Sequence, residues 1–522
     1  MENQKTKIIS IASIIALALT LVTATFAYFM AQTGEGKSTD IKINASTVDT
    51  FTFEAGSALN LSLNQENFAS GAGNQTGTTF AKAMLTANNK TNTATEHYYL
   101  YLNISNNTFT YSIDNNTPEI LLSIKDGSNN EITSVSGLTY KTVTDGKGAS
   151  IKGFDITTKK GLITILNNRE ITTTSTKTEE WNVTVTFVNY NSNQAGNAGK
   201  NFNAKLMIQK EGYTLAEYVV SQYSGTQGEN GIYYHDASLA NGAGDNSYRY
   251  AGASESVNNF VCFGSTTSPC PTDNLYRIIG VFGENNHGVT GKQLVKLIKY
   301  DYATSNLLGT DGDYLGTSAP DSTYYKGSLS SIDRYYWNYK ATNKASNTWS
   351  TSLLNKINLN TNYLNNIGTT WSNLIEDATW KVSGHSTESV TPSEMYTSEI
   401  TNATKTYGPS DGTSKIGLMY VSDYGFAASP SAWTTNLVSY DGNDANGTSI
   451  KTINWMYMGY FDWTISPASS DSYHVFYLSN RGHVNNISSY SGYGSRPVVY
   501  LKASVLYAGG SGTKDSPITL VV

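Results

Sequence analysis

Short runs in which apolar and polar residues alternate, separated by turns rich in Asn and Gly, fill the sequence from about residue 40 to residue 210. In the run WNVTVTFVNY, the apolar residues from Trp181 to Phe187 alternate with Asn and Thr, and FNAKLMIQ, which begins at Phe202, repeats the pattern. A period of two places the apolar side chains on one face of a strand. Because many such runs occur without a long helical pattern, the sequence predicts an antiparallel β-sandwich over residues 32–212.

A helix and a glycine-rich segment follow the predicted sandwich. In EGYTLAEYVVSQY, Thr214 and Glu217 have the spacing of a capping box, in which Thr caps the helix and Glu reaches back to it. The next stretch, SGTQGENG, is typical of a flexible junction. Residues 213–230 are therefore expected to link two domains.

The second predicted domain, residues 231–522, mixes strands with helical stretches and irregular segments. Apolar runs at LYRIIGVF, QLVKLIKYDY, IGLMYVSDYGF, HVFYL, RPVVYLKASV and ITLVV predict strands. TSLLNKINLNTNYLNNI and TWSNLIEDATW predict helix, with Leu353, Leu354 and Ile357 on one helical face. This order predicts an α+β domain, so the fold class as a whole is a multidomain chain in which an all-β sandwich precedes an α+β domain.

The first 31 residues have the features of an export signal. Lys5 and Lys7 precede a long apolar run, and the small residues Thr25 and Ala27 suit cleavage after Ala27. The apolar stretch Ile8–Ala31 is also long enough to cross a bilayer as an uncleaved anchor. In both cases the rest of the chain is expected to be extracellular, at the cell surface, touching the membrane only through this segment.

The charge balance excludes one class of partner. Only 15% of the 522 residues are charged and the formal net charge is -6, whereas nucleic-acid binding requires a basic face. The polar character comes instead from Asn, Thr, Ser and Gly, together with 37 Tyr and 8 Trp. That mixture favours sheets, loops and contact surfaces.

Two cysteines occur in the chain, Cys262 and Cys270. Their spacing in an exported protein predicts a small disulfide loop, with two unpaired buried thiols as the alternative. A metal site is not expected, because a structural metal needs about four clustered ligands and none lie nearby in the sequence.

Catalytic patterns are sparse. The histidines lie far apart, without the H-E-x-x-H spacing of a metal site, at His97, His235, His287, His385, His474 and His483. An approach of His474 to His483 across a hairpin is one option, and side chains in a solvated loop are the favoured interpretation, because perturbed or liganded histidines are a minority. There is no G-x-S-x-G elbow and no glycine-rich phosphate loop before a helix, so no enzyme activity and no cofactor are predicted.

Two oxygen-rich stretches are candidate calcium sites, SYDGNDANGTS with Asp441, Asn443 and Asp444, and GTDGDYLG with Asp311 and Asp313. Neither matches an EF-hand loop, because Ala445 stands where a ligand is needed. Both are better explained by the turn-forming tendency of Asp and Asn.

The N-terminal part resembles the camelysin-type family of exported fibre subunits. The resemblance rests on TFAYF in the signal region and on WNVTVTFVNY late in the strand-rich domain. It implies an extracellular fibre or biofilm matrix, although TFAYF also occurs on unrelated surface proteins.

The second half resembles a bacterial domain of the formylglycine-generating-enzyme-like and C-type-lectin-like fold group. The residues that carry this resemblance are LYRIIGVF, NWMYMGYFDWTISP from Asn454 and GYGSRPVVYL from Gly492. It implies a C-type-lectin-like fold for residues 231–522. The enzymes of the group use a pair of cysteines near the C-terminus, and none follows Cys270, so the oxidase activity is not expected.

In this fold group, the segment between the Trp-Thr strand and the Arg-Pro strand faces the ligand, and some members are targets of diversity-generating retroelements. Here the corresponding segment, from Ser469 to Ser495, is crowded with Asn, Ser, Tyr, Gly and His, which also suit a binding surface. The predicted ligand-binding residues are Tyr473, His474, Asn480, Arg481, His483, Asn485, Asn486, Tyr490 and Tyr493. Trp455, Trp463 and Arg496 are expected to be structural.

The sequence thus favours an exported surface protein with a non-enzymatic module that binds a protein or glycan ligand or mediates adhesion. The alternative is a structural subunit of an extracellular fibre or biofilm matrix.

Overall fold

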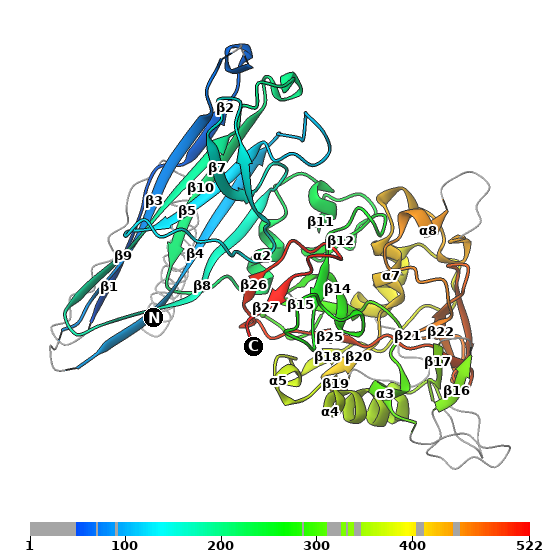
Figure 1. The fold of residues 1–522 in the computed structure, drawn as a ribbon. Coiled ribbons are helices and arrows are strands. Elements are labelled where there is room, and N and C mark those ends of the chain that lie inside the picture. Colours follow the sequence, from blue (N-terminus) through cyan, green and yellow to red (C-terminus); the bar gives the residue numbers. More distant parts are fainter. Residues whose placement is uncertain are drawn as a thin grey trace, which may run out of the picture. The chain divides into compact units, whose positions relative to one another are not determined.

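The computed structural model describes residues 49–68, 71–88, 92–283, 287–310, 325–329, 332–338, 346–402, 412–441 and 449–522. The predicted export segment, residues 1–31, lies outside this range, as do Asp311, Asp313, Asn443 and Asp444. No helix within the described ranges is long and apolar enough to cross a membrane. The chain divides into two compact units between Glu211 and Gly212, and antiparallel sheet dominates (Figure 1).

The N-terminal unit consists of two antiparallel sheets. One has six strands in the order β1-β3-β9-β5-β7-β6, and the other has four in the order β2-β10-β4-β8. The strands are β1 (Thr50–Ala55), β2 (Leu59–Ser62), β3 (Gln75–Thr86), β4 (Ala94–Asn107), β5 (Ile120–Asp126), β6 (Tyr140–Thr144), β7 (Ser150–Asp155), β8 (Gly161–Thr173), β9 (Thr176–Phe187) and β10 (Asn201–Gln209).

The two sheets enclose one apolar core, as the alternating pattern predicts. In β9, Trp181, Val183, Val185 and Phe187 are buried while Asn182 is exposed. The Trp181 Nε1 donates a hydrogen bond of 2.8 Å to the hydroxyl of Tyr98 in the facing sheet. The sandwich-like character of this unit is therefore confirmed.

Helix α2 (Leu215–Ser221) forms as predicted but is not part of a linker. Thr214 and Glu217 form the capping box. The ring of Tyr218 stacks on Tyr507 with centroids 3.8 Å apart, and the amide of Leu215 donates to the Val505 carbonyl at 2.7 Å. Residues 213–230, expected as linker and flexible junction, therefore belong to the C-terminal unit, because the helix buries its apolar face there.

The C-terminal unit is built around a sheet in the order β11-β12-β14-β15-β25-β20, with β13 paired to β14. Smaller sheets are β16-β17-β24, β18-β19, β21-β22-β23 and β26-β27. The strands are β11 (Ile232–His235), β12 (Ser247–Tyr250), β13 (Phe260–Cys262), β14 (Leu275–Phe282), β15 (Leu294–Lys299), β16 (Tyr325–Leu329), β17 (Ile332–Tyr336), β18 (Ala378–Trp380), β19 (Gly412–Ser414), β20 (Ile416–Gly417), β21 (Asp462–Pro467), β22 (His474–Leu478), β23 (Val484–Ser488), β24 (Gly492–Tyr493), β25 (Val498–Tyr500), β26 (Tyr507–Gly509) and β27 (Thr519–Leu520).

Short helices connect these strands. The α-helices besides α2 are α3 (Ser305–Leu308), α4 (Leu364–Asn366), α5 (Thr369–Ser372), α6 (Pro392–Tyr396), α7 (Val421–Ala427) and α8 (Ile450–Ile453). Two π-helices are η6 (Leu354–Tyr363) and η7 (Thr397–Thr401). Single 3₁₀ turns are η1 (Gln65–Phe68), η2 (Ala195–Asn197), η3 (Glu229–Gly231), η4 (Thr272–Asn274), η5 (Trp349–Thr351), η8 (Pro430–Ala432) and η9 (Leu437–Ser439).

Three local predictions for the C-terminal unit were wrong. IGLMYVSDYGF contains only the short strand β20 before α7, because the Asp423 carboxylate accepts the Tyr420 amide and starts a helix. TWSNLIEDATW has one helical turn and then enters β18. The helix that follows Leu353 is π-helical, so Leu354 is fully buried while Leu353 and Ile357 stay partly exposed.

Candidate functional site

The segment predicted to bind ligand is mostly an ordered sheet rather than a loop. Strands β22 and β23 form a hairpin, and β22 also pairs with β21. In the register, Trp463, Tyr477 and Asn485 lie directly opposite one another across the three strands. Residues that oppose each other in a sheet share a face, so this row defines one face of the hairpin. Asn486, the next residue, lies on the other face.

Aromatic rings gather on the face that carries Trp463. Tyr493 of β24 packs against Trp463 with ring centroids 4.8 Å apart and against Tyr477 at 4.7 Å. Phe461 stacks on Tyr493 at 5.0 Å with the rings nearly parallel, at 15°. We call Phe461, Tyr477, Tyr493 and Asn485 the aromatic face; all four are partly exposed, whereas Trp463 beneath them is completely buried.

Among the polar groups of the aromatic face, the Asn485 amide has uncommitted hydrogen-bonding capacity. The hydroxyls of Tyr477 and Tyr493 hydrogen-bond to each other, and burial raises the pKa of both, so both tyrosines are neutral. No side-chain hydrogen bond of Asn485 is found among the residues that the structure describes. A ligand that presents the flat face of a ring can therefore stack on these aromatic side chains and form a hydrogen bond with Asn485.

Other predicted binding residues lie on the opposite face or at the open end of the hairpin. Asn486 donates a hydrogen bond to the carboxylate of Glu388 at 2.9 Å. His474 contacts Asp471, with 2.6 Å between Nδ1 and Oδ2, and its ring lies beside that of Tyr473. These residues are not brought together with Tyr493.

A third group lies at the turn of the hairpin. Arg481 Nη2 and His483 Nε2 contact the same Oδ2 atom of Asp441, at 2.8 and 3.4 Å. The Asn480 side chain is exposed, while its carbonyl accepts a hydrogen bond of 2.7 Å from the Tyr457 hydroxyl.

The strand register contradicts an approach of His474 to His483. His474 pairs with Ser488 at the open end of the hairpin, and His483 follows the turn at the other end. Tyr490, between β23 and β24, is 40% exposed and has no ring contact among the described residues.

Trp455, Trp463 and Arg496 are buried, as expected of structural residues. The Trp463 Nε1 donates to the Tyr335 carbonyl at 2.8 Å, and the Trp455 Nε1 donates to Tyr250 at the same distance. Arg496 Nε contacts the Asp462 carboxylate at 2.5 Å. These contacts hold β21 and the segment before β25 in place behind the aromatic face.

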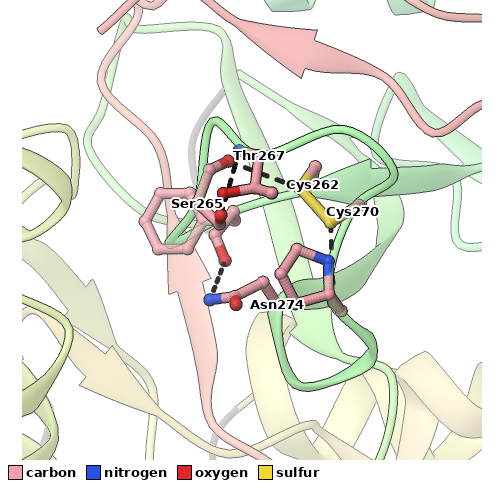
Figure 2. The surroundings of a disulfide bond; sticks show 7 residues. Cys262, Ser265, Thr267, Cys270 and Asn274 are labelled. Carbon is pink, nitrogen blue, oxygen red and sulfur yellow. Dashed lines mark hydrogen bonds between the residues drawn. A yellow bond between two sulfur atoms is a disulfide. The ribbon is translucent and has the colours of Figure 1, made fainter.

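Cys262, at the end of β13, and Cys270 are joined by a disulfide (Figure 2). Within the enclosed loop, the Thr267 amide donates to the Ser265 hydroxyl at 3.1 Å. From outside the loop, the Asn274 side chain donates to the Phe263 carbonyl at 3.3 Å. The disulfide therefore closes a small hydrogen-bonded loop beside β14.

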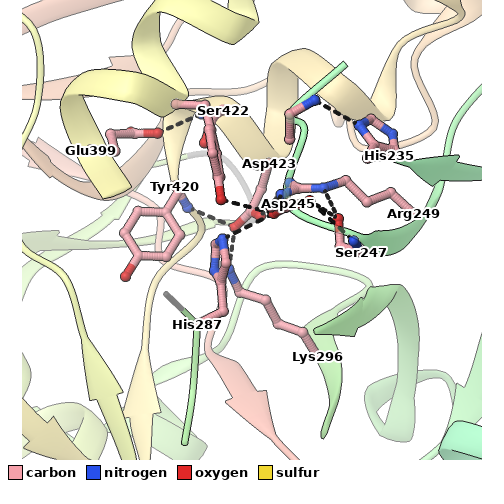
Figure 3. Close-up of polar contacts among 12 residues, drawn as sticks. His235, Asp245, Ser247, Arg249, His287, Lys296, Glu399, Tyr420, Ser422 and Asp423 are labelled. Carbon is pink, nitrogen blue, oxygen red and sulfur yellow. Dashed lines mark hydrogen bonds and ion pairs between the residues drawn. The ribbon is translucent and has the colours of Figure 1, made fainter. Parts of the chain in front are cut away.

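A cluster of charged side chains lies in the interior of the C-terminal unit (Figure 3). Lys296 contacts Asp423, and Arg249 contacts Asp245 at 2.7 Å. Burial opposes ionisation of Asp245, but Arg249 and then His287 lower its pKa well below the ordinary value. Two positive and two negative groups therefore balance inside the protein, as buried charges require.

Neighbouring groups of this cluster are held neutral or nearly so. Burial, and then Arg249, lowers the pKa of His235 to about 3. Burial raises the pKa of Glu399 to about 7, although hydrogen bonds from Ser422 and Ser466 act against the rise. Among the described residues, no three His, Cys, Asp or Glu side chains are grouped to hold a metal ion.

Sequence reasoning missed Phe461 and Tyr477 of the aromatic face and the whole charged cluster. Tyr477 belongs to the run HVFYL, which predicts a strand. Because side chains alternate along a strand, Tyr477 lies on the face away from the buried Phe476. The signal for the cluster was Lys296 within the otherwise apolar run QLVKLI. Comparison with models of protein families, with curated proteins and with solved structures finds no match to this chain.

Proposed function

We propose that the chain is an exported bacterial cell-surface protein whose C-terminal unit is a non-enzymatic module that binds a protein or glycan ligand. The observation that carries this proposal is the aromatic face, where Phe461, Tyr477 and Tyr493 lie partly exposed over the buried Trp463. The recognition surface is thus narrower than the whole segment Ser469–Ser495.

The physical case for binding rests on rigidity and amphipathic chemistry. Tyr and Phe have only two side-chain torsions, so ordering them on binding costs little conformational entropy. Their faces offer apolar contact, while Tyr hydroxyls and the Asn485 amide offer hydrogen bonds. The rings are already packed against one another and against Trp463, which is the pre-organisation that an interface needs.

The charged cluster supports a binding module over an enzyme. Lys296 and Asp423 side chains are 0% exposed, and those of Arg249 and Asp245 are 1% and 7% exposed. A catalytic group must come within hydrogen-bond reach of its substrate. Groups enclosed to this extent instead hold strands and helices together.

The remaining parts of the proposal come from the sequence. Residues 1–31 export the chain and provide its membrane contact, the N-terminal sandwich serves as a stalk, and no cofactor or nucleic acid takes part. A C-type-lectin-like arrangement of residues 231–522 is included, because in such folds the segment before the last core strands carries recognition.

An array of immobilised glycans and extracellular proteins, probed with the exported chain, tests the proposal. We expect saturable binding to a defined glycan or protein, unaffected by chelation of divalent ions. Absence of saturable binding across both arrays would contradict the proposed function.

A further inference from the structure

Lys296 and Asp423 touch in the interior of the C-terminal unit, and Figure 3 shows the two side chains end to end. Lys296 Nζ lies 2.5 Å from Asp423 Oδ2, and both side chains are 0% exposed. Lys296 belongs to β15 and Asp423 to the first turn of α7, 127 positions apart in the sequence. Folding thus places an amine against a carboxyl group in a site closed to water.

Aromatic rings surround the amine. Lys296 Nζ lies 4.3 Å from the ring centroid of Tyr420, 5.4 Å from those of Phe282 and Tyr500, and 5.8 Å from that of Trp380. Burial lowers the pKa of Lys296, although Asp423 acts against this. A desolvated lysine with a lowered pKa holds more of its neutral form, which is the nucleophile.

Only one of the two carboxyl oxygens of Asp423 contacts the Lys296 amine. Asp423 Oδ2 accepts the Tyr420 amide at 2.9 Å and contacts Lys296. Among the described residues, Oδ1 has no hydrogen-bond partner, and Arg249 Nη1, which also has none, lies 3.7 Å from it. A positive group facing Oδ1 is placed to stabilise negative charge that develops on that atom during attack at the carboxyl carbon.

We propose that Lys296 and Asp423 are joined by an intramolecular amide bond between Nζ and the carboxyl carbon. A proton passes from Nζ to Oδ2, and the neutral amine then attacks the carboxyl carbon, with the charge on Oδ1 facing Arg249. The bond to Oδ2 breaks, and this oxygen leaves as water with two of the three ammonium protons. One ammonium and one carboxylate thus become one amide and one water, and no oxidant, reductant or activating co-reactant is consumed.

Two physical effects favour this reaction in the folded chain. Fixing the two groups in contact converts a slow bimolecular condensation into an intramolecular one with a large effective concentration. The product replaces two buried charges by a neutral amide, which removes the desolvation penalty of a buried ion pair. The remaining Arg249 and Asp245 still balance each other at 2.7 Å.

Peptide mapping of the purified chain tests whether Lys296 and Asp423 are joined by this bond. Protein purified from its producing cells is denatured, reduced and digested with trypsin, and the peptides are analysed by tandem mass spectrometry. We expect one branched peptide that contains both Lys296 and Asp423 and lacks the mass of one water, with no cleavage after Lys296. Linear peptides that end at Lys296, together with an unmodified Asp423 peptide, would overturn the proposal.

Two variants separate this bond from adventitious cross-linking. Lys296→Arg keeps the positive charge but removes the amine, so the branched peptide should disappear. Lys299→Arg is the matched control, because Lys299 lies on the same strand and is 1% exposed, and it should retain the branched peptide. A branched peptide in which Lys299, not Lys296, is joined to Asp423 would also overturn the proposal. If a variant fails to fold, the peptide map of the wild-type protein still tests whether the bond exists.

Discussion

Glu399 is a buried side chain whose ionisation is expected to change the stability of the C-terminal unit. Its carboxylate accepts the amides of Val421 and Ser422 at 2.9 and 3.0 Å and is completely buried. These bonds fix the start of α7 and therefore the position of Asp423. Burial raises its pKa from 4.5 to about 7.

The raised pKa of Glu399 predicts a loss of stability as pH rises. Below about pH 4.5 the carboxyl is protonated in both states, so its contribution is fully present, and it is lost as pH rises to about 7. The shift corresponds to about 3 kcal/mol of unfolding free energy. Urea unfolding across this window should show the decrease as the difference between the wild-type chain and Glu399→Gln, because the lowered pKa values of the buried His235 and His287 change the stability of both proteins in the opposite direction.

Glu394→Gln on the preceding helix is the control for that experiment. Hydrogen bonds from Thr391 lower the pKa of Glu394, so its contribution has the opposite sign and is lost as pH falls. If Glu399→Gln leaves the pH dependence unchanged, the assignment to Glu399 is wrong.

At the scale of elements, the turn of the β22–β23 hairpin depends on Gly482. Its φ is +96°, and a Cβ built there would lie 2.5 Å from Ile450 Cγ2. The Ser479 amide donates to the His483 carbonyl across this turn at 2.8 Å. The hairpin that carries Tyr477 and Asn485 is therefore closed by a residue that has no side chain.

Replacing Gly482 by Ala should destabilise the C-terminal unit by about 1–3 kcal/mol, because the backbone is strained for other residues and the methyl group collides. Asn480→Ala, in the same turn but exposed, should change stability by less than about 0.5 kcal/mol. Denaturant unfolding compares the two variants. Equal stability for both would mean that the turn can relax without cost.

The Cys262–Cys270 loop gives a second prediction at this scale. The two residues are 8 positions apart, and chain-entropy reasoning for so short a loop gives about 2–3 kcal/mol of stabilisation. Mass spectrometry of unreduced peptides should find the two cysteines linked, and the double variant Cys262→Ala/Cys270→Ala should lose about that stability. Two free thiols in the purified protein would refute the pairing.

Elements with a clear period were predictable from sequence, and those set by tertiary contacts were not. The alternation in β9 and the capping box of Thr214 and Glu217 were sufficient to predict those elements. α7 was missed because its start also depends on Glu399, which accepts the amides of Val421 and Ser422 from a separate helix. Of the four residues of the aromatic face, the sequence predicted only Tyr493 and Asn485 as binding residues, because the other two rings come from separate strands and loops.

At the scale of the whole molecule, the two compact units differ in what they contain. The N-terminal unit is a sandwich closed around its own core, and the C-terminal unit contains the aromatic face and the charged cluster. On the proposed function, the exported chain acts as an individual binding protein.

Electron microscopy of the purified chain should therefore show separate particles rather than filaments. The N-terminal strands already pair within their own two sheets, which leaves the sheet edges as the remaining sites for strand addition. Regular filaments under physiological salt would favour the alternative of a fibre or matrix subunit.

The most direct test of the central proposal compares three proteins on the same array of glycans and extracellular proteins. The wild-type chain is measured beside Tyr477→Ala/Tyr493→Ala and beside Tyr490→Ala, with the melting temperature of each recorded to confirm folding. Tyr490 is the matched control, because it is an exposed Tyr of the same segment outside the aromatic face. We predict that the double variant loses binding by at least about tenfold, or 1.4 kcal/mol, while Tyr490→Ala binds like the wild type. Full binding by a folded double variant would contradict the account.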